Sequence, residues 1–307
     1  MQQGRSNNIP VFRSEPCPRL DPLQVFAAAG TAPRFYWEQP SARRFRVGIG
    51  CAARLTVQGA GRFGQADERA RELLGQLAWD GPGPRVAHLV GGFAFAPSLA
   101  ESELWRGFPD GELRLPELVH WSDGDLCVRD FCIGSRWAAL QPRPLALSHP
   151  VRGAAEIGNG GPGPYIASVN RALEEIRRGT LRKVVLARAV HVKASLGIDP
   201  VSWLVALRER FPSCTLFAVG ECDTVFLGAS PEQLVRVQGA EVQTAALAGT
   251  APRGASQADD RALGEALRDS LKDGDEHAFV VRHLQSVLET CCDDVEAASQ
   301  PRLLRTR

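Results

Sequence analysis

Three ionisable side chains in the second half of the chain could do chemistry: two stand where predicted strands begin or end, and the third lies in a predicted helix. Lys183 opens the segment KVVLARAV, Glu232 follows a proline after the apolar segment FLGAS, and Glu276 lies within KDGDEHAFVV. Residues that do chemistry are commonly placed at such points on a rigid scaffold. An amine and two carboxylates could serve as a base, an acid and a metal ligand, and each also has a purely structural interpretation.

The lysine is unusual because of its neighbours. In a strand, alternation places Lys183 on the same face as Val185, Ala187 and Ala189. Removal from water on this small apolar face disfavours the ammonium form and lowers the pKa, which would make Lys183 a usable general base. The structural alternative is a lysine at a strand end whose amino group reaches water.

Glu232 comes directly after a strand-ending proline. Pro231 has no N–H group and a fixed φ angle, so it marks a bend or the end of a strand. We expect Glu232 at the rim of a sheet, where apolar surroundings would raise its pKa and suit a general acid. A base and an acid with opposed pKa shifts form a recurring catalytic pattern, whereas the structural alternative is a solvated turn residue.

Glu276 extends the apolar stripe of a predicted helix. Val280, Leu284 and Val287 follow helical spacing, Glu276 lies four residues before Val280, and Asp273 can share that face. Carboxylates together on an inward face suit a hard cation such as Mg²⁺. The structural alternative is an acidic helix start that is stabilised by the helix dipole.

Two further features surround these acids. The segment TAALAGTAPRG, residues 244–254, offers the N–H group of Gly249 and the hydroxyl of Thr250 as donors to an anionic ligand, although it is equally compatible with an ordinary loop. We interpret His277 as a core or capping histidine rather than a metal ligand.

Hydrophobic periodicity predicts the elements that hold these residues. Residues 1–20 are expected to be poorly ordered, and residues 21–150 to form a β-rich part with one helix at 66–79. Its strands are RFYWEQ, RRFRVGIG, RVAHLVGGFAFA and GDLCVRDFCIG. The Gly/Pro-rich residues 150–164 indicate a surface connection.

The remaining residues, 165–307, alternate helices with strands. We expect a helix with the stripe Ile166 to Ile176, a strand at RKVVLARAVHV, and a helix from Asp199-Pro200 to about Arg210. Then follow the strands CTLFAVG and DTVFLGAS, a hairpin of EQLVRV with EVQTAALAG, and a helical tract over 259–292. The predicted class is α/β or α+β with a large, mainly antiparallel sheet.

Composition narrows the class of protein. The 307 residues are 44% hydrophobic and carry a net charge of +1, which permits a large core and disfavours nucleic acid or a membrane surface as partner. The N-terminus lacks an apolar signal core, and no apolar run approaches the roughly 18 residues of a membrane span. We therefore expect a soluble, cytoplasmic monomer or weak dimer. Its eight scattered cysteines are expected to be buried thiols rather than zinc ligands or disulfides.

Four segments in order, KVVLAR, FLGASPE, ALAGTAPRG and KDGDEH, resemble the chorismate-utilising enzymes. This family includes isochorismate, salicylate, anthranilate and aminodeoxychorismate synthases, and the motifs lie within about residues 165–290. The earlier segments FYWEQP and GGFAFAP are similar to the N-terminal part of menaquinone-type isochorismate synthases. The resemblance implies a single large α/β unit with packed, mainly antiparallel sheets and outer helices.

The resemblance also implies a reaction and roles for the three ionisable residues. Chorismate would be the substrate, and Mg²⁺ would hold its carboxylate, with Glu276 as one ligand. Lys183 would deprotonate the water that attacks C2, and Glu232 would protonate the departing C4 hydroxyl, which yields isochorismate.

Ala248, Gly249 and Thr250 would line the substrate pocket, and two positions distinguish members of the family. Members that add ammonia carry a non-basic residue where Lys183 stands, and aminodeoxychorismate synthases carry a lysine where this chain has Ala248. Both positions favour isochorismate formation. Salicylate synthases share the lysine, so the motifs leave a salicylate synthase as an alternative. The motifs also do not decide between menaquinone and siderophore biosynthesis.

Family members continue beyond the point where this sequence ends in QPRLLRTR. The resemblance implies that the further segment supplies a second magnesium-binding glutamate and basic residues for the substrate carboxylates. We therefore expect a C-terminally incomplete, truncated or frameshifted reading of a longer enzyme. The alternative is a non-catalytic remnant that binds a ligand or partner without turnover.

Overall fold

The computed structural model describes residues 10–96, 105, 107–142, 148, 150, 155–158 and 162–305. The chain divides into two compact units. The first comprises residues 1–144 and 207–307, and the second comprises residues 145–206. Lys183 belongs to the second unit, while the other predicted site residues belong to the first.

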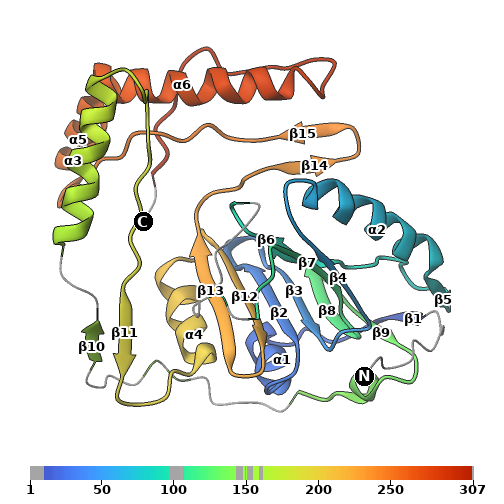
Figure 1. The fold of residues 1–307 in the computed structure, drawn as a ribbon. Coiled ribbons are helices and arrows are strands. Elements are labelled where there is room, and N and C mark those ends of the chain that lie inside the picture. Colours follow the sequence, from blue (N-terminus) through green and yellow to red (C-terminus); the bar gives the residue numbers. More distant parts are fainter. Residues whose placement is uncertain are drawn as a thin grey trace. The chain divides into compact units, whose positions relative to one another are not determined.

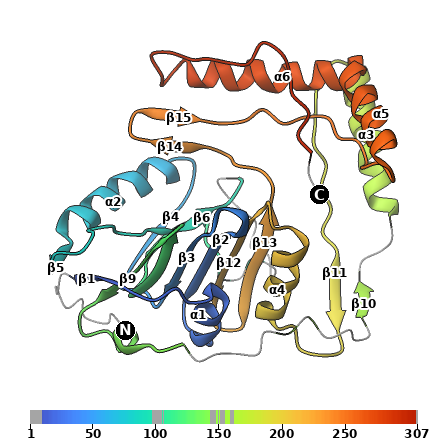
Figure 2. The ribbon, with the colours of Figure 1, turned by 180° about the vertical axis from the view of Figure 1, so that it is seen from behind.

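An eight-stranded sheet forms the centre of the first unit (Figures 1 and 2). Its strand order is β13-β12-β2-β3-β8-β9-β1-β5, and its pairs are antiparallel except for β1 with β5. The strands are β1 Val11–Pro16, β2 Arg34–Gln39, β3 Arg44–Ile49, β5 Ala78–Asp80, β8 Leu118–Asp123, β9 Leu126–Cys132, β12 Thr215–Glu221 and β13 Thr224–Ser230. The pairing of β12 with β2 places strands from the two sequence regions 21–150 and 165–307 in one sheet.

Alternation along the strands builds the core on one face of this sheet. Tyr36, Val47 and Leu216 are fully buried, and they come from β2, β3 and β12. Helix α1, Pro22–Ala28, packs against β2 and β3, and its Phe26 ring lies 5.8 Å from the Tyr36 ring. Burial of each such side chain contributes roughly 1.5–3 kcal/mol to folding.

Charged residues connect α4, Pro200–Arg210, with β2 and the start of α1. The guanidinium group of Arg208 donates to Glu38 at 2.9 Å and to Asp21 at 3.0 Å. Asp21 is also the N-cap of α1, where its carboxylate accepts from the N–H of Leu23. One ion-pair network therefore fixes the start of α1 against β2.

A smaller sheet with the strand order β4-β7-β6 lies in the same unit. Its strands are β4 Ala53–Val57, β6 Val90–Phe93 and β7 Gly111–Leu115, and helix α2, Arg62–Gln76, contacts β4 and β7. Two short 3₁₀ helices, η1 Pro40–Ala42 and η3 Arg136–Ala139, occur in loops.

The last part of the first unit contains a hairpin and two helices. β14 Arg236–Gln238 pairs with β15 Glu241–Gln243 through a two-residue turn in which Gly239 has a positive φ angle. Helix α5, Gln257–Asp269, begins with a capping box, and α6, Leu271–Leu288, begins at the N-cap Ser270.

The second unit contains β10 Ala155–Gly158, α3 Gly163–Arg177, β11 His191–Ala194 and the first turns of α4, Pro200–Arg210. β10 and β11 pair antiparallel. The carboxylate of Asp199 accepts hydrogen bonds from the N–H groups of Val201 at 3.1 Å and Ser202 at 3.0 Å, so α4 starts where the sequence predicted.

The predicted mixed α/β class with a large, mainly antiparallel sheet is confirmed. Four local expectations were wrong. Of the strand expected at 182–192, only His191 and Val192 lie in a ladder, as the start of β11, and of the strand expected at 85–96 only Val90–Phe93 does. A strand needs a hydrogen-bonded partner as well as an apolar sequence. The helical tract breaks at Ser270, whose side chain caps α6.

The fourth concerns the N-terminus. Residues 1–9 lie outside the described residues, but Val11–Pro16 forms a strand paired with β9 and β5. The cysteines also differ in part from expectation: all eight are free thiols, but only Cys127 and Cys214 are buried. Among the described residues, no helix combines the length and apolar character needed to cross a membrane.

Candidate active site

Glu232 stands in the turn that ends β13. The N–H of Glu232 donates to the hydroxyl of Ser230 at 3.3 Å, and this hydroxyl donates to the carbonyl of Glu232 at 3.1 Å. The predicted strand end at Pro231 is therefore confirmed. The side chain of Glu232 is exposed, which differs from the apolar surroundings that we expected for a general acid.

The segment that follows β15 contains the three predicted pocket residues. Gly249 has a φ angle of +78°, and a Cβ atom on it would come within 3.1 Å of the Cβ of Asp273. The left-handed backbone conformation favours glycine, and a Cβ atom would fit only if Asp273 moved by a few tenths of an ångström. This contact places Ala248 and Thr250, its chain neighbours, beside the first turn of α6; Ala248 is half-buried and Thr250 is exposed.

Hydrogen bonds hold this segment at its start and middle. The hydroxyl of Thr244 donates to the carbonyl of Leu234 at 2.7 Å, two residues beyond Glu232. The Nε2 atom of His277 lies 3.2 Å from the carbonyl oxygen of Ala246. These two hydrogen bonds connect the 244–254 segment to the stretch after Glu232 on one side and to α6 on the other.

The far end of the segment is attached to α5. The N–H of Gly254 donates to the carboxylate of Asp260 at 3.1 Å, and Arg253 donates to the same carboxylate at 2.6 Å. Hydrogen bonding to Arg253 lowers the pKa of Asp260. The loop therefore lies between two helices and the strand-end stretch, without a ladder of its own.

Glu276 lies half-buried on α6, one helical turn after Asp273. Ser270 and Asp273 bond reciprocally: the Ser270 hydroxyl donates to the Asp273 carboxylate and accepts from the Asp273 N–H at 3.3 Å. Asp273 therefore has the helix-start role that was the structural alternative. His277 is half-buried rather than in the core, and its Nε2 atom lies 3.2 Å from the carbonyl oxygen of Ala246 instead of capping an end of α6.

The residues present do not form a complete magnesium site. Within the part of the chain that the structure describes, no group of three or more His, Cys, Asp and Glu side chains could hold a metal ion. Magnesium takes about six oxygen ligands in near-octahedral geometry. Glu276 could contribute one of them.

Lys183 is half-buried and lies in a stretch, residues 181–190, that has neither strand nor helix structure. It has an interaction partner within the chain. Because it belongs to the second unit, its approach to Glu232 and Glu276 stays a prediction.

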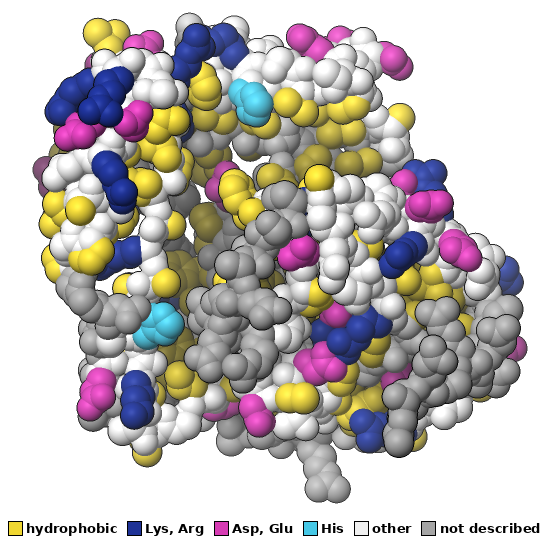
Figure 3. All heavy atoms as spheres, in the orientation of Figure 1, with side chains coloured by type: hydrophobic (Ala, Val, Ile, Leu, Met, Phe, Trp, Pro, Cys, Tyr) yellow, Lys and Arg dark blue, Asp and Glu magenta, His cyan; other side chains and the backbone are white. Residues whose placement is uncertain are grey.

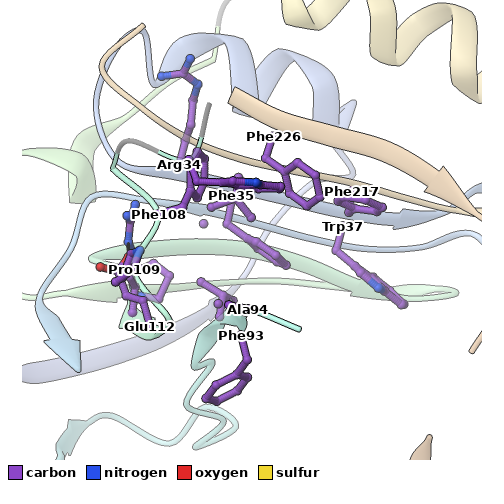
Figure 4. A pocket seen from close by; sticks show the side chains of 18 of the residues that line it. Arg34, Phe35, Trp37, Phe93, Ala94, Phe108, Pro109, Glu112, Phe217 and Phe226 are labelled. Atoms are coloured by element: carbon purple, nitrogen blue, oxygen red, sulfur yellow. Dashed lines mark hydrogen bonds and ion pairs between the residues drawn. The ribbon is translucent and has the colours of Figure 1, made fainter. Parts of the chain in front are cut away.

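Sequence reasoning missed an aromatic cavity of about 630 Å³ in the first unit (Figure 4). Its wall carries side chains from β2, β12 and β13, and Figure 4 shows Phe217 and Phe226 beside each other near Trp37. The signal was present, because residues 35 and 37 are aromatic and lie on the strand face opposite Tyr36. The described lining residues do not include any of the predicted site residues.

A charged cluster adjoins this cavity, because its members Glu112 and Arg114 line the wall. Glu221 accepts from Arg54 at 2.8 Å and from Arg114 at 2.9 Å, and Arg114 also pairs with Glu112. Hydrogen bonding to Arg54 lowers the pKa of Glu221. Burial lowers the pKa of Arg34, which also lines the cavity.

Charges of both signs share the outer surface. On the face shown in Figure 3, basic and acidic side chains are mixed, in line with the net charge of +1. Large apolar side chains are exposed as well, among them Val185, Leu234 and Leu271.

Two curated relatives resemble the chain along most of its length. It is 35% identical over 306 residues to the salicylate biosynthesis isochorismate synthase of Pseudomonas aeruginosa, covering 93% of this chain and 63% of that protein. It is 27% identical over 324 residues to the isochorismate synthase MenF of Bacillus subtilis, covering 94% of this chain and 66% of that protein. The chain thus spans about two thirds of these relatives.

A solved structure resembles the fold. The menaquinone-specific isochorismate synthase MenF of Escherichia coli superposes with a TM-score of 0.75 at 24% identity, covering 98% of this chain and 70% of that one. The family model described as chorismate binding enzyme matches residues 2–133 and 145–307. With nearly all of its residues matched by that model, the chain belongs to the chorismate binding enzyme family.

Proposed function

We propose that the protein is an isochorismate synthase that converts chorismate to isochorismate. The observation that carries the proposal is that a member of the chorismate binding enzyme family has Lys183, Glu232, Ala248 and Glu276 together. The names of the two curated relatives support the same reaction.

In the proposed reaction a base and an acid act on the substrate ring. Lys183 accepts a proton from a water molecule as its oxygen bonds to C2 of chorismate. The ring double bonds shift, the bond from C4 to its hydroxyl breaks, and Glu232 donates the proton with which this hydroxyl leaves as water. One water enters and one leaves, so the reaction is an isomerisation. Each positioned acid or base contributes about 10²–10⁴-fold in rate.

The segment Ala248–Thr250 is proposed to bind the substrate. The contact between Gly249 and Asp273 keeps this segment beside α6, where main-chain N–H groups and the Thr250 hydroxyl can donate to an anion. Ala248 stands where aminodeoxychorismate synthases carry a lysine, which favours isochorismate formation.

Magnesium is proposed as the cofactor, with Glu276 as one ligand and the substrate carboxylate and water among the others. The cation would neutralise the carboxylate charge when it is bound. The names of the relatives include both menaquinone-specific and salicylate-biosynthesis enzymes. We therefore propose that isochorismate feeds menaquinone or siderophore biosynthesis; a cytoplasmic location and a monomeric or weakly dimeric state remain predictions.

The test is to incubate the purified protein with chorismate and magnesium and to separate the products by liquid chromatography. We expect isochorismate, without salicylate or anthranilate, and loss of the product when a chelator removes the cation. Salicylate as the product would reassign the reaction. No product from a folded protein that still binds chorismate would contradict turnover and indicate the non-catalytic alternative.

A further inference from the structure

We propose that His277 is a positioning residue for the substrate: it holds the loop of Ala248–Thr250 at a fixed place on α6. The expected effect on KM rests on the proposed function, whereas the contact between His277 and Ala246, called the tether below, is a property of the fold. The Nε2 atom of His277 lies 3.2 Å from the carbonyl oxygen of Ala246, two residues before Ala248.

The loop depends on single contacts because it has no ladder. Residues 244–254 form neither strand nor helix. Thr244 bonds to the stretch after β13, and Gly254 bonds to α5. Neither of these end contacts reaches α6, whereas the bond from His277 does.

The bond matters because His277 lies on α6, the helix that also carries Glu276. His277 is the chain neighbour of Glu276, the proposed magnesium ligand, so the bond would set how far the loop of Ala248–Thr250 lies from the carboxylate of Glu276. The contact of Gly249 with Asp273 lies one helical turn earlier. Two points of attachment on one rigid helix determine both the position and the direction of the loop.

The donor and acceptor roles in this hydrogen bond predict which amino acids can replace His277 and keep the bond. A carbonyl oxygen only accepts, so Nε2 of His277 must carry a proton and donate. Glutamine can place an amide N–H at a similar distance from the backbone. Leucine has similar bulk but no donor, and asparagine has a donor on a shorter side chain. The series therefore separates hydrogen bonding from packing.

The experiment compares His277→Leu, His277→Asn and His277→Gln with the matched control His283→Leu, an exposed histidine on the same helix. Two readouts are collected: kcat and KM for chorismate, and hydrogen–deuterium exchange of the amides in residues 244–250. We expect His277→Leu and His277→Asn to raise KM about tenfold, with a smaller change in kcat, and to speed exchange in the loop. His277→Gln should recover most of both losses.

The outcomes are distinct. If loop exchange and KM in His277→Leu and His277→Asn match those of His283→Leu, the proposal is wrong. If His277→Leu does not fold, the comparison of His277→Asn with His277→Gln decides it. If the unmodified protein makes no isochorismate but the exchange pattern holds, the tether stands and the proposed function fails.

Discussion

Gly249 and Asp273 approach each other so closely that a methyl group on the glycine would lie 3.1 Å from the Cβ of the aspartate. These residues belong to different segments, the loop after β15 and the first turn of α6. The φ angle of Gly249 is also positive, so both its backbone conformation and its close approach to Asp273 link the predicted pocket to the helix of the predicted metal ligand.

Replacement of this glycine should therefore displace the loop. Gly249→Ala is expected to cost about 1–3 kcal/mol through backbone strain and the contact with Asp273, and to raise KM for chorismate. Gly124→Ala is the matched control, since Gly124 has a φ angle of +76° but no neighbouring atom within 4 Å of the place that a Cβ would occupy. Thermal unfolding and steady-state kinetics of both variants check this. Equal KM values for the two would contradict a role for the close approach.

Glu232 is expected to matter for turnover and not for folding. Glu232→Gln should lower kcat by about 10²–10⁴-fold, because the amide cannot donate the proton that the leaving hydroxyl needs. Its exposed side chain predicts a change in unfolding free energy of less than about 0.5 kcal/mol. Glu241→Gln, an exposed glutamate on β15, serves as control. A kcat close to that of the control would remove Glu232 from the mechanism.

Lys183 should be needed for the attack of water. We expect Lys183→Met to reduce kcat by about 10²-fold or more, because methionine keeps much of the side-chain length but cannot accept a proton. Lys193→Met, at an exposed position on β11, should leave kcat unchanged. Single-turnover formation of isochorismate measures the chemical step directly. Retention of the rate in Lys183→Met would mean that another group, or bulk water, supplies the base.

The ion pairs of Glu221 predict a loss of stability in acid. Hydrogen bonding to Arg54 lowers the pKa of Glu221 below its ordinary value of 4.5 in the folded protein. A lowered folded-state pKa stabilises the fold above the unfolded-state value, and this stabilisation disappears as the pH falls through the folded-state value.

Urea unfolding of the unmodified protein and of Glu221→Gln across this range tests the sign. The difference in unfolding free energy between them should shrink as the pH decreases below about 4.5. Since Glu221 is about one-third exposed, solvent screening keeps the effect small. A difference that grows towards low pH would contradict the assignment.

Much of the local structure could be predicted from the sequence because its causes are local. RFYWEQ forms β2 over the predicted residues, and Asp199-Pro200 begins α4, since alternation and helix capping act over a few neighbouring residues. The strand predicted after Lys183 was wrong because local composition was the only basis for it. Its composition favours a strand, but a strand also requires a partner, which composition cannot supply.

For the candidate site, too, some features could be predicted from the sequence and others depend on the fold. The sequence by itself determined the family and the residue types, because Lys183, Glu232 and Glu276 occur in motifs whose order is visible in one dimension. Only the tertiary structure decided that Gly249 touches Asp273, that His277 binds the carbonyl of Ala246, and that Asp273 caps its own helix with Ser270. These contacts depend on where chain segments meet after folding, and the pairing of segments distant in sequence follows from packing rather than from local propensity.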